Sequence, residues 1–216
     1  MLFRSEAPTG ADGELALAAR WANQQLTLSA DPGGAPLHER GWRLEPGMAP
    51  LRETVAAAVL AATGWTGEGT LWDTTCGSGT LAIEAACWRR PISRRFAVDD
   101  WTLPADSVAW PRIEVPTGLQ LVAGDRDPEA VARARRNADR AGVAACIDFQ
   151  VAEWAQQRVP PASHGWVVCN PPWGQRLGGR NEARRAVERL ATVVRRRCPG
   201  WQLGAVVPER TLAAVL

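Results

Sequence analysis

Two common residue types are missing from this chain of 216 residues, which contains no lysine and no tyrosine. All 25 basic side chains are therefore arginine, and 11 tryptophans supply most of the aromatic rings. The guanidinium group of arginine forms bidentate hydrogen bonds with phosphates and stacks on bases, which would suit an RNA partner. A GC-rich genome gives the same bias, and we favour that explanation because asparagine, isoleucine and phenylalanine are scarce as well. A formal net charge of +2 is too small to indicate nucleic-acid binding by itself.

Long apolar runs are also missing. No stretch reaches the about 20 residues of a membrane span, and the N-terminus has no apolar signal-peptide segment. The 5 cysteines are widely spaced and include no C-x-x-C pair, which argues against a zinc site or a disulfide framework. We therefore expect a cytoplasmic protein with no membrane partner and no metal. His38 and His164 lie in loop or edge contexts and are assigned no catalytic role.

The order of elements predicts an α/β fold. Residues 1–45 predict a small β-rich appendage, with strands expected over 14–21, 25–30 and 37–44. Beyond residue 46, helices are expected over 50–62, 80–88, 128–141 and 181–197. Strands are expected over 70–73, 118–125, 146–151, 165–169 and 203–207, and a long surface loop over 101–116. Repeated strand–helix units predict a mostly parallel sheet with helices on both faces.

The motif Asn170-Pro171-Pro172-Trp173 directly follows the strand expected over 165–169. Two consecutive prolines cannot continue a strand ladder, since each lacks an N–H donor. The strand therefore stops, and Asn170 and Trp173 are held in a rigid loop at its carboxyl end, where open α/β sheets bind ligands. An amide acceptor beside an aromatic ring suits a planar base with an exocyclic amine. An ordinary Pro-Pro turn is the alternative.

A glycine-rich loop, Asp73-Thr74-Thr75-Cys76-Gly77-Ser78-Gly79-Thr80, lies between a predicted strand and its helix. Gly77 and Gly79 let the backbone approach a ligand closely, and the helix N-terminus beyond them favours a carboxylate or phosphate. The loop is neither a P-loop nor a complete G-x-G-x-x-G motif. On its own, an ordinary strand–helix turn is the simpler explanation.

Acidic residues follow the next two predicted strands. Asp125 stands where a carboxylate can bind both hydroxyls of a ribose. Asp127, before Pro128, is better explained as a helix N-cap. Glu153 is placed to accept a hydrogen bond from an adenine amine, and a solvated loop glutamate explains it nearly as well.

The order of these features resembles that of class I S-adenosylmethionine-dependent methyltransferases, which have a Rossmann-like fold. More narrowly, the chain is similar to the RNA guanine-N2 methyltransferases usually linked to a THUMP domain. The narrower match covers about residues 25–210. It rests on four stretches: Leu37-His38-Glu39-Arg40-Gly41-Trp42-Arg43, Ala49-Pro50-Leu51-Arg52-Glu53, Asp73 to Thr80, and Asn170 to Gly178.

The resemblance implies S-adenosylmethionine as cofactor and the N2 amine of a guanine in structured RNA (large-subunit rRNA or tRNA) as substrate. The implied cofactor-binding residues are Asp73, Cys76, Gly77, Ser78, Gly79, Thr80, Asp125 and Glu153. The implied catalytic residues are Asn170, Pro171, Pro172 and Trp173, which grip the target base.

The chain departs from the family pattern at three positions. Trp173 replaces a tyrosine, Thr74 a proline and Glu153 an aspartate. We expect no THUMP domain within this sequence, because residues 1–36 are too few to form it, and we expect the family's last two strands to be truncated. We therefore expect an appendage over 1–45, a methyltransferase domain over 46–216, and an RNA-binding domain or subunit elsewhere.

Two alternatives remain open. Adenine N6 in DNA or RNA, and a glutamine amide in a protein, are amine substrates that use the same kind of Asn-Pro-Pro-aromatic loop. A catalytically silent cofactor-binding scaffold is an alternative of a different class.

Overall fold

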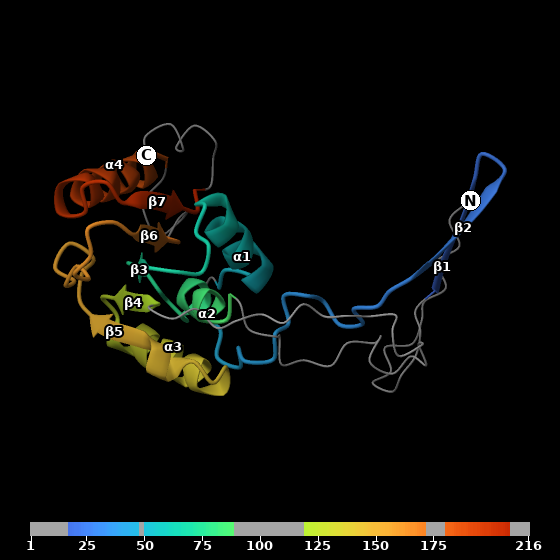
Figure 1. The fold of residues 1–216 in the computed structure, drawn as a ribbon, viewed down its shortest axis with the longest axis horizontal. Coiled ribbons are helices and arrows are strands. Elements are labelled where there is room, and N and C mark those ends of the chain that lie inside the picture. Colours follow the sequence, from blue (N-terminus) through green and yellow to red (C-terminus); the bar gives the residue numbers. More distant parts are fainter. Residues whose placement is uncertain (1–16, 48–49, 89–118, 172–179, 208–216) are drawn as a thin grey trace. The chain divides into compact units, whose positions relative to one another are not determined.

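The computed structural model describes residues 17–47, 50–88, 119–171 and 180–207, and Figure 1 shows the order of their elements. By their contacts these residues belong to two units, one ending at Arg40 and one beginning at Gly41. Each unit is described by itself. The predicted boundary between an appendage over 1–45 and a domain over 46–216 stays a prediction.

The first unit contains a β-hairpin. Strand β1 (Leu17–Ala22) pairs antiparallel with β2 (Gln25–Ala30). The two turn residues, Asn23 and Gln24, both have positive φ, at 50° and 60°. Two-residue hairpin turns of this kind match the twist of the flanking strands. The hairpin confirms two of the strands expected in this region.

The prediction of a third strand over 37–44 is wrong. The backbone there forms local turns, with the Glu39 N–H donating to the Pro36 carbonyl over 2.9 Å. Gly41 has a φ of 89°, which breaks an extended conformation. Trp42 is the one buried residue of the segment 37–44. The apolar positions that suggested a strand therefore do not line one face of a sheet.

The second unit is built on a sheet of 5 strands in the order β5-β4-β3-β6-β7, with every adjacent pair parallel. The strands are β3 (Thr70–Asp73), β4 (Gln120–Asp125), β5 (Ile147–Val151), β6 (Trp166–Cys169) and β7 (Gln202–Ala205). The chain runs outward from β3 to β5, then crosses back to place β6 on the other side of β3 (Figure 1). The strand order therefore reverses between β3 and β6, which is where such sheets bind ligands.

Helices cover both faces of this sheet. They are α1 (Glu53–Ala62), α2 (Thr80–Ala86), α3 (Pro128–Arg140) and α4 (Arg180–Arg197), and a short 3-10 turn, η2 (Ala144–Cys146), precedes β5. Helix α3 starts as expected, because the Asp127 side chain accepts a hydrogen bond from the Glu129 N–H over 2.9 Å.

Successive residues of β3 show how the two faces are filled. Leu71 packs into the cluster formed with α1, α2 and α3, whereas Trp72 packs into the cluster formed with α4. This alternation follows from the period of two in a strand. The predicted α/β arrangement is confirmed. None of the helices in the described ranges combines the length and apolar character needed to cross a membrane.

Candidate active site

The loops that carry the predicted site residues meet at the carboxyl edge of the sheet. Asp73 pairs with Ala123 on one side and with Val168 on the other, and Asp125 pairs with Val151. The loops after β5, β4, β3 and β6 therefore lie next to one another in that order. They carry, respectively, Glu153, Asp125, the glycine-rich loop 73–80 and Asn170.

Backbone hydrogen bonds hold the glycine-rich loop between the neighbouring strands. The Thr74 N–H donates to the Val168 carbonyl over 3.1 Å, and the Cys76 N–H donates to the Gly124 carbonyl over 2.9 Å. Gly79, with a φ of 88°, precedes α2. A Cβ at Gly79 would lie 3.0 Å from the Cβ of Ala134 in α3, so glycine allows the loop and the two helices to pack closely.

Asp125, the last residue of β4, connects the loops that follow β3 and β4. One of its carboxylate oxygens accepts a hydrogen bond from the Gly77 N–H over 3.0 Å, and the other accepts from the Asp127 N–H over 3.0 Å. An ionised carboxylate offers about four acceptor positions, so each oxygen can accept a further donor. Asp125 is half-buried. It thus shapes the glycine-rich loop and keeps acceptor capacity for a ligand.

Asp73 is fully buried, and one of its oxygens accepts a hydrogen bond from the Thr75 N–H over 3.3 Å. Its other oxygen, and the hydroxyl oxygens of Thr74 and Thr75, are buried without a hydrogen-bond partner among the described residues. Burial raises the pKa of Asp73 to about 8, and the nearby charge of Asp125 adds to this effect. Asp73 is therefore mainly protonated at neutral pH. An unpaired buried polar atom costs about 1–3 kcal/mol, so this cluster favours a polar ligand.

Two cysteines at the carboxyl edge of the sheet are buried, and their thiols are unreactive. Burial raises the pKa of Cys76 in the loop and of Cys169 at the end of β6. A thiol held neutral in this way is a poor nucleophile. Cys76 contributes its backbone to the loop, and nothing in the geometry indicates covalent chemistry.

Gln157 is a residue at this edge that the sequence analysis missed. It is 1% exposed, and its side-chain amide group donates to the carbonyls of Thr74 and Ala152, both over 3.0 Å. Its amide oxygen accepts from the Trp72 indole N–H over 2.9 Å. A glutamine in a loop carries no periodic signal, so nothing in the sequence pattern could have revealed these contacts.

The remaining predicted residues differ in how they are placed. The Ser78 carbonyl accepts a hydrogen bond from the Asn137 side chain over 3.1 Å, and the hydroxyl oxygens of Ser78 and Thr80 lie 3.5 Å apart. Glu153 is exposed and forms an ion pair with Arg126 over 3.4 Å. Asn170 and Pro171 are half-buried at the end of β6. Pro172 and Trp173 lie outside the described residues.

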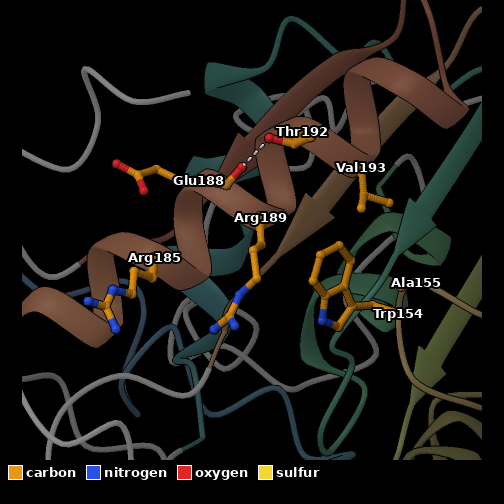
Figure 2. Close-up of a pocket in the computed structure, with 7 residues that line it drawn as sticks. All are labelled: Trp154, Ala155, Arg185, Glu188, Arg189, Thr192 and Val193. Carbon is orange, nitrogen blue, oxygen red and sulfur yellow. Dashed lines mark hydrogen bonds between the residues drawn. The ribbon is translucent and has the colours of Figure 1, made fainter.

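An open pocket of about 470 Å³ begins one residue beyond Glu153 (Figure 2). It lies between the loop after β5 and helix α4, and no predicted site residue lines it. Its lining residues are Trp154, Ala155, Arg185, Glu188, Arg189, Thr192 and Val193.

The fold and the loops at its carboxyl edge define a class I methyltransferase domain. A solved structure from Listeria monocytogenes str. 4b F2365, described as a predicted N6-adenine-specific DNA methylase, matches with a TM-score of 0.72 and 30% identity. The match covers 92% of this chain and 55% of that one. The chain belongs to the family of RMKL-like methyltransferase domains, whose model matches residues 40–216.

Curated relatives agree with this assignment. A ribosomal RNA large subunit methyltransferase K/L from Legionella pneumophila (strain Lens) is 36% identical over 219 residues, covering 94% of this chain and 31% of the relative. The protein of the same name from Shewanella frigidimarina (strain NCIMB 400) is 33% identical over 215 residues, covering 92% and 30%. The chain thus spans less than a third of the length of these relatives.

Proposed function

We propose that this chain transfers a methyl group from S-adenosylmethionine to the exocyclic N2 amine of a guanine in large-subunit rRNA. The observation that carries the proposal is the placement of four loops on one sheet edge, in the order Glu153, Asp125, glycine-rich loop, Asn170. Large-subunit rRNA is favoured over tRNA because the curated relatives carry that name.

The residues of the edge fit the cofactor. The unpaired buried atoms of Asp73, Thr74 and Thr75 supply polar partners for its methionine portion, alongside the backbone and side chains of residues 76–80. Asp125 retains acceptor positions for the ribose hydroxyls, and Glu153 is exposed where an adenine amine can reach it. When bound, this cofactor supplies an electrophilic methyl group on its sulfonium sulfur.

The Asn-Pro-Pro-Trp loop holds the target base. The side-chain oxygen of Asn170 and the carbonyl of Pro171 accept the two amine hydrogens. Trp173 stacks on the guanine, a contact worth about 1–3 kcal/mol per base. No strong base is needed, because the amine proton becomes acidic once the nitrogen is alkylated. Positioning and fixed dipoles supply most of the rate acceleration.

A second candidate is methylation of adenine N6. It is favoured by the description of the Listeria structure, which is 30% identical to this chain. An Asn-Pro-Pro-aromatic loop grips either amine in the same way, so the loop alone does not choose between the two bases.

Product analysis separates the two candidates. The chain is incubated with unmodified large-subunit rRNA and S-adenosylmethionine, and the RNA is digested and its nucleosides identified by mass spectrometry. We expect N2-methylguanosine, with DNA and tRNA as control substrates. N6-methyladenosine, or methylated adenine in the DNA control, would support the second candidate. No methylated nucleoside from a folded, cofactor-binding chain would support a silent scaffold instead.

We propose the cytoplasm as the compartment, a choice supported by 5 free cysteines. We further propose that residues 1–45 are an appendage to the methyltransferase domain over 46–216. An additional RNA-binding domain or subunit would contribute contacts that this domain does not make.

A further inference from the structure

The pocket between α4 and Trp154 contains none of the residues assigned to the proposed reaction. We propose that it binds a single-stranded segment of the substrate RNA, with Arg185 and Arg189 contacting phosphates and Trp154 stacking on a base. This inference rests on the proposed function and adds to it a specific RNA-contacting surface. Helix α4 follows β6 and returns to the start of β7, so its first turns lie near the carboxyl edge of the sheet.

Two arginines supply positive charge at this pocket. Arg185 and Arg189 are exposed, lie four residues apart, and project from the same side of α4 in Figure 2. Residues with this spacing are neighbours on a helix surface. Neither arginine side chain forms a hydrogen bond or an ion pair with a residue that the structure describes. Their charge is therefore available to phosphate groups.

Several other arginines of the described residues are already paired. On the same helix, Arg184 donates to the Glu188 carboxylate over 2.8 Å. Arg136 and Arg140 both bind Glu45. Glu188, the acidic residue on the pocket rim, is the partner of Arg184 in the ion pair on α4. Glu188 also lines the pocket, and in Figure 2 its carboxylate points away from Trp154.

The opposite wall of the pocket presents an aromatic ring. Trp154 is half-buried and lies with Ala155 across from Val193 (Figure 2). Arg197 holds the backbone beneath it by donating to the Trp154 carbonyl over 3.2 Å and to the Ala155 carbonyl over 2.8 Å. These bonds hold the backbone that carries the ring, and the ring itself packs against the apolar cluster formed with α4. A fixed aromatic face beside unpaired guanidinium groups is what single-stranded nucleic acid requires, since bases stack while phosphates bind cations.

The test measures binding of a short fluorescein-labelled oligo(A) RNA by fluorescence anisotropy over a series of salt concentrations. The double variant Arg185→Ala with Arg189→Ala is compared with Arg184→Ala, an exposed arginine of the same helix that is already paired. Two lost phosphate contacts should lower the slope of log affinity against log salt by about 1.4, because each contributes about 0.7 on a single strand. Arg184→Ala should keep the wild-type slope. Trp154→Leu should weaken binding about tenfold.

Several results would overturn the inference. These are wild-type affinity and slope in the double variant, an equal loss in Arg184→Ala, or no oligo(A) binding by the wild-type chain. Stronger wild-type binding to a polyglutamate peptide than to oligo(A) would instead indicate an acidic protein partner. Because the Arg185 and Arg189 side chains are exposed, the double variant tests the proposal even if Trp154→Leu fails to fold.

Methyl transfer measured on the same proteins separates this inference from the proposed function. A wild-type chain that methylates rRNA while the double variant binds RNA normally would overturn the RNA-binding pocket alone. If the wild-type chain binds RNA without methylating it, and the double variant binds RNA more weakly, the proposed function alone would be overturned. Calorimetric titration with S-adenosylmethionine should give the same affinity for wild type and double variant.

Discussion

The side-chain amide of Gln157 donates a hydrogen bond to the main-chain carbonyl of Thr74 over 3.0 Å, although the residues lie 83 positions apart. The same amide group donates to Ala152, just before Glu153. Gln157 therefore ties the loop after β5 to the loop after β3. Both loops belong to the proposed cofactor site, so the shape of that site depends on a residue outside it.

Replacing Gln157 with leucine tests this dependence. The carbonyls of Thr74 and Ala152 and the indole N–H of Trp72 would lose their partner, so we expect the free energy of unfolding to fall by about 3 kcal/mol. Cofactor affinity should fall as well. Urea denaturation and calorimetric titration measure the two effects. The exposed neighbour Gln156→Leu is the matched control, and equal losses in both variants would contradict the assignment.

Gly124→Ala tests the same contact from the other side. A Cβ at Gly124 would lie 2.3 Å from the amide carbon of Gln157, so the amide must move away from Thr74. We expect a loss of about 1–3 kcal/mol in unfolding free energy. Gly47→Ala is the control, because a Cβ there meets nothing within 4 Å. Combined with Gln157→Ser, Gly124→Ala should cost less than the sum of the single changes, and strict additivity would argue against direct contact.

Asp73→Asn should change how stability depends on pH. The pKa of Asp73 rises from 3.8 to about 8 in the folded chain, mainly because the group is buried. The folded state therefore holds a proton that the unfolded state releases, and stability falls as pH rises from about 4 to about 8. The variant lacks this proton, so its melting temperature relative to wild type should be higher at pH 8 than at pH 4. Circular dichroism melts across this range check the prediction, with exposed Asp148→Asn as control. Parallel curves for wild type and Asp73→Asn would contradict it.

Arg43 and Glu53 form a nearly buried ion pair, with 11% and 3% of their side chains exposed. The Arg43 Nε donates to a Glu53 oxygen over 2.9 Å. Glu53→Ala would leave the Arg43 charge buried and unpaired, which should cost about 3–5 kcal/mol in unfolding free energy. Glu188→Ala, which breaks the exposed pair with Arg184, should cost less than about 1 kcal/mol. Denaturant titrations of the two variants give the comparison, and similar small losses would contradict the role of the buried pair.

The sequence was a good guide where local pattern determines structure. Alternating strands and helices predicted the sheet, and the position of Asp125 and Asn170 after their strands predicted their place on one edge. Asp127 before Pro128 predicted the start of α3. These features depend on neighbours along the chain or on the regular behaviour of strand–helix units.

Prediction from the sequence failed where contacts between residues far apart in the chain determine the structure. The turns at 37–44 replace an expected strand because a single buried tryptophan, and not one face of a strand, anchors that segment. Gln157 and the Arg43–Glu53 pair acquire their roles only through residues brought close by folding. The neutral state of Asp73 depends on burial and on the charge of Asp125, which its position in the motif does not reveal.

The most direct test of the account is the single-turnover rate of methyl transfer to large-subunit rRNA, compared between wild type and Asn170→Ala. By analogy with the loss of one oxyanion-hole donor, the variant should be slower by about 10²–10³ while its affinity for S-adenosylmethionine is unchanged. A variant that keeps more than half of the wild-type rate, with cofactor affinity intact, would show that Asn170 does not hold the amine.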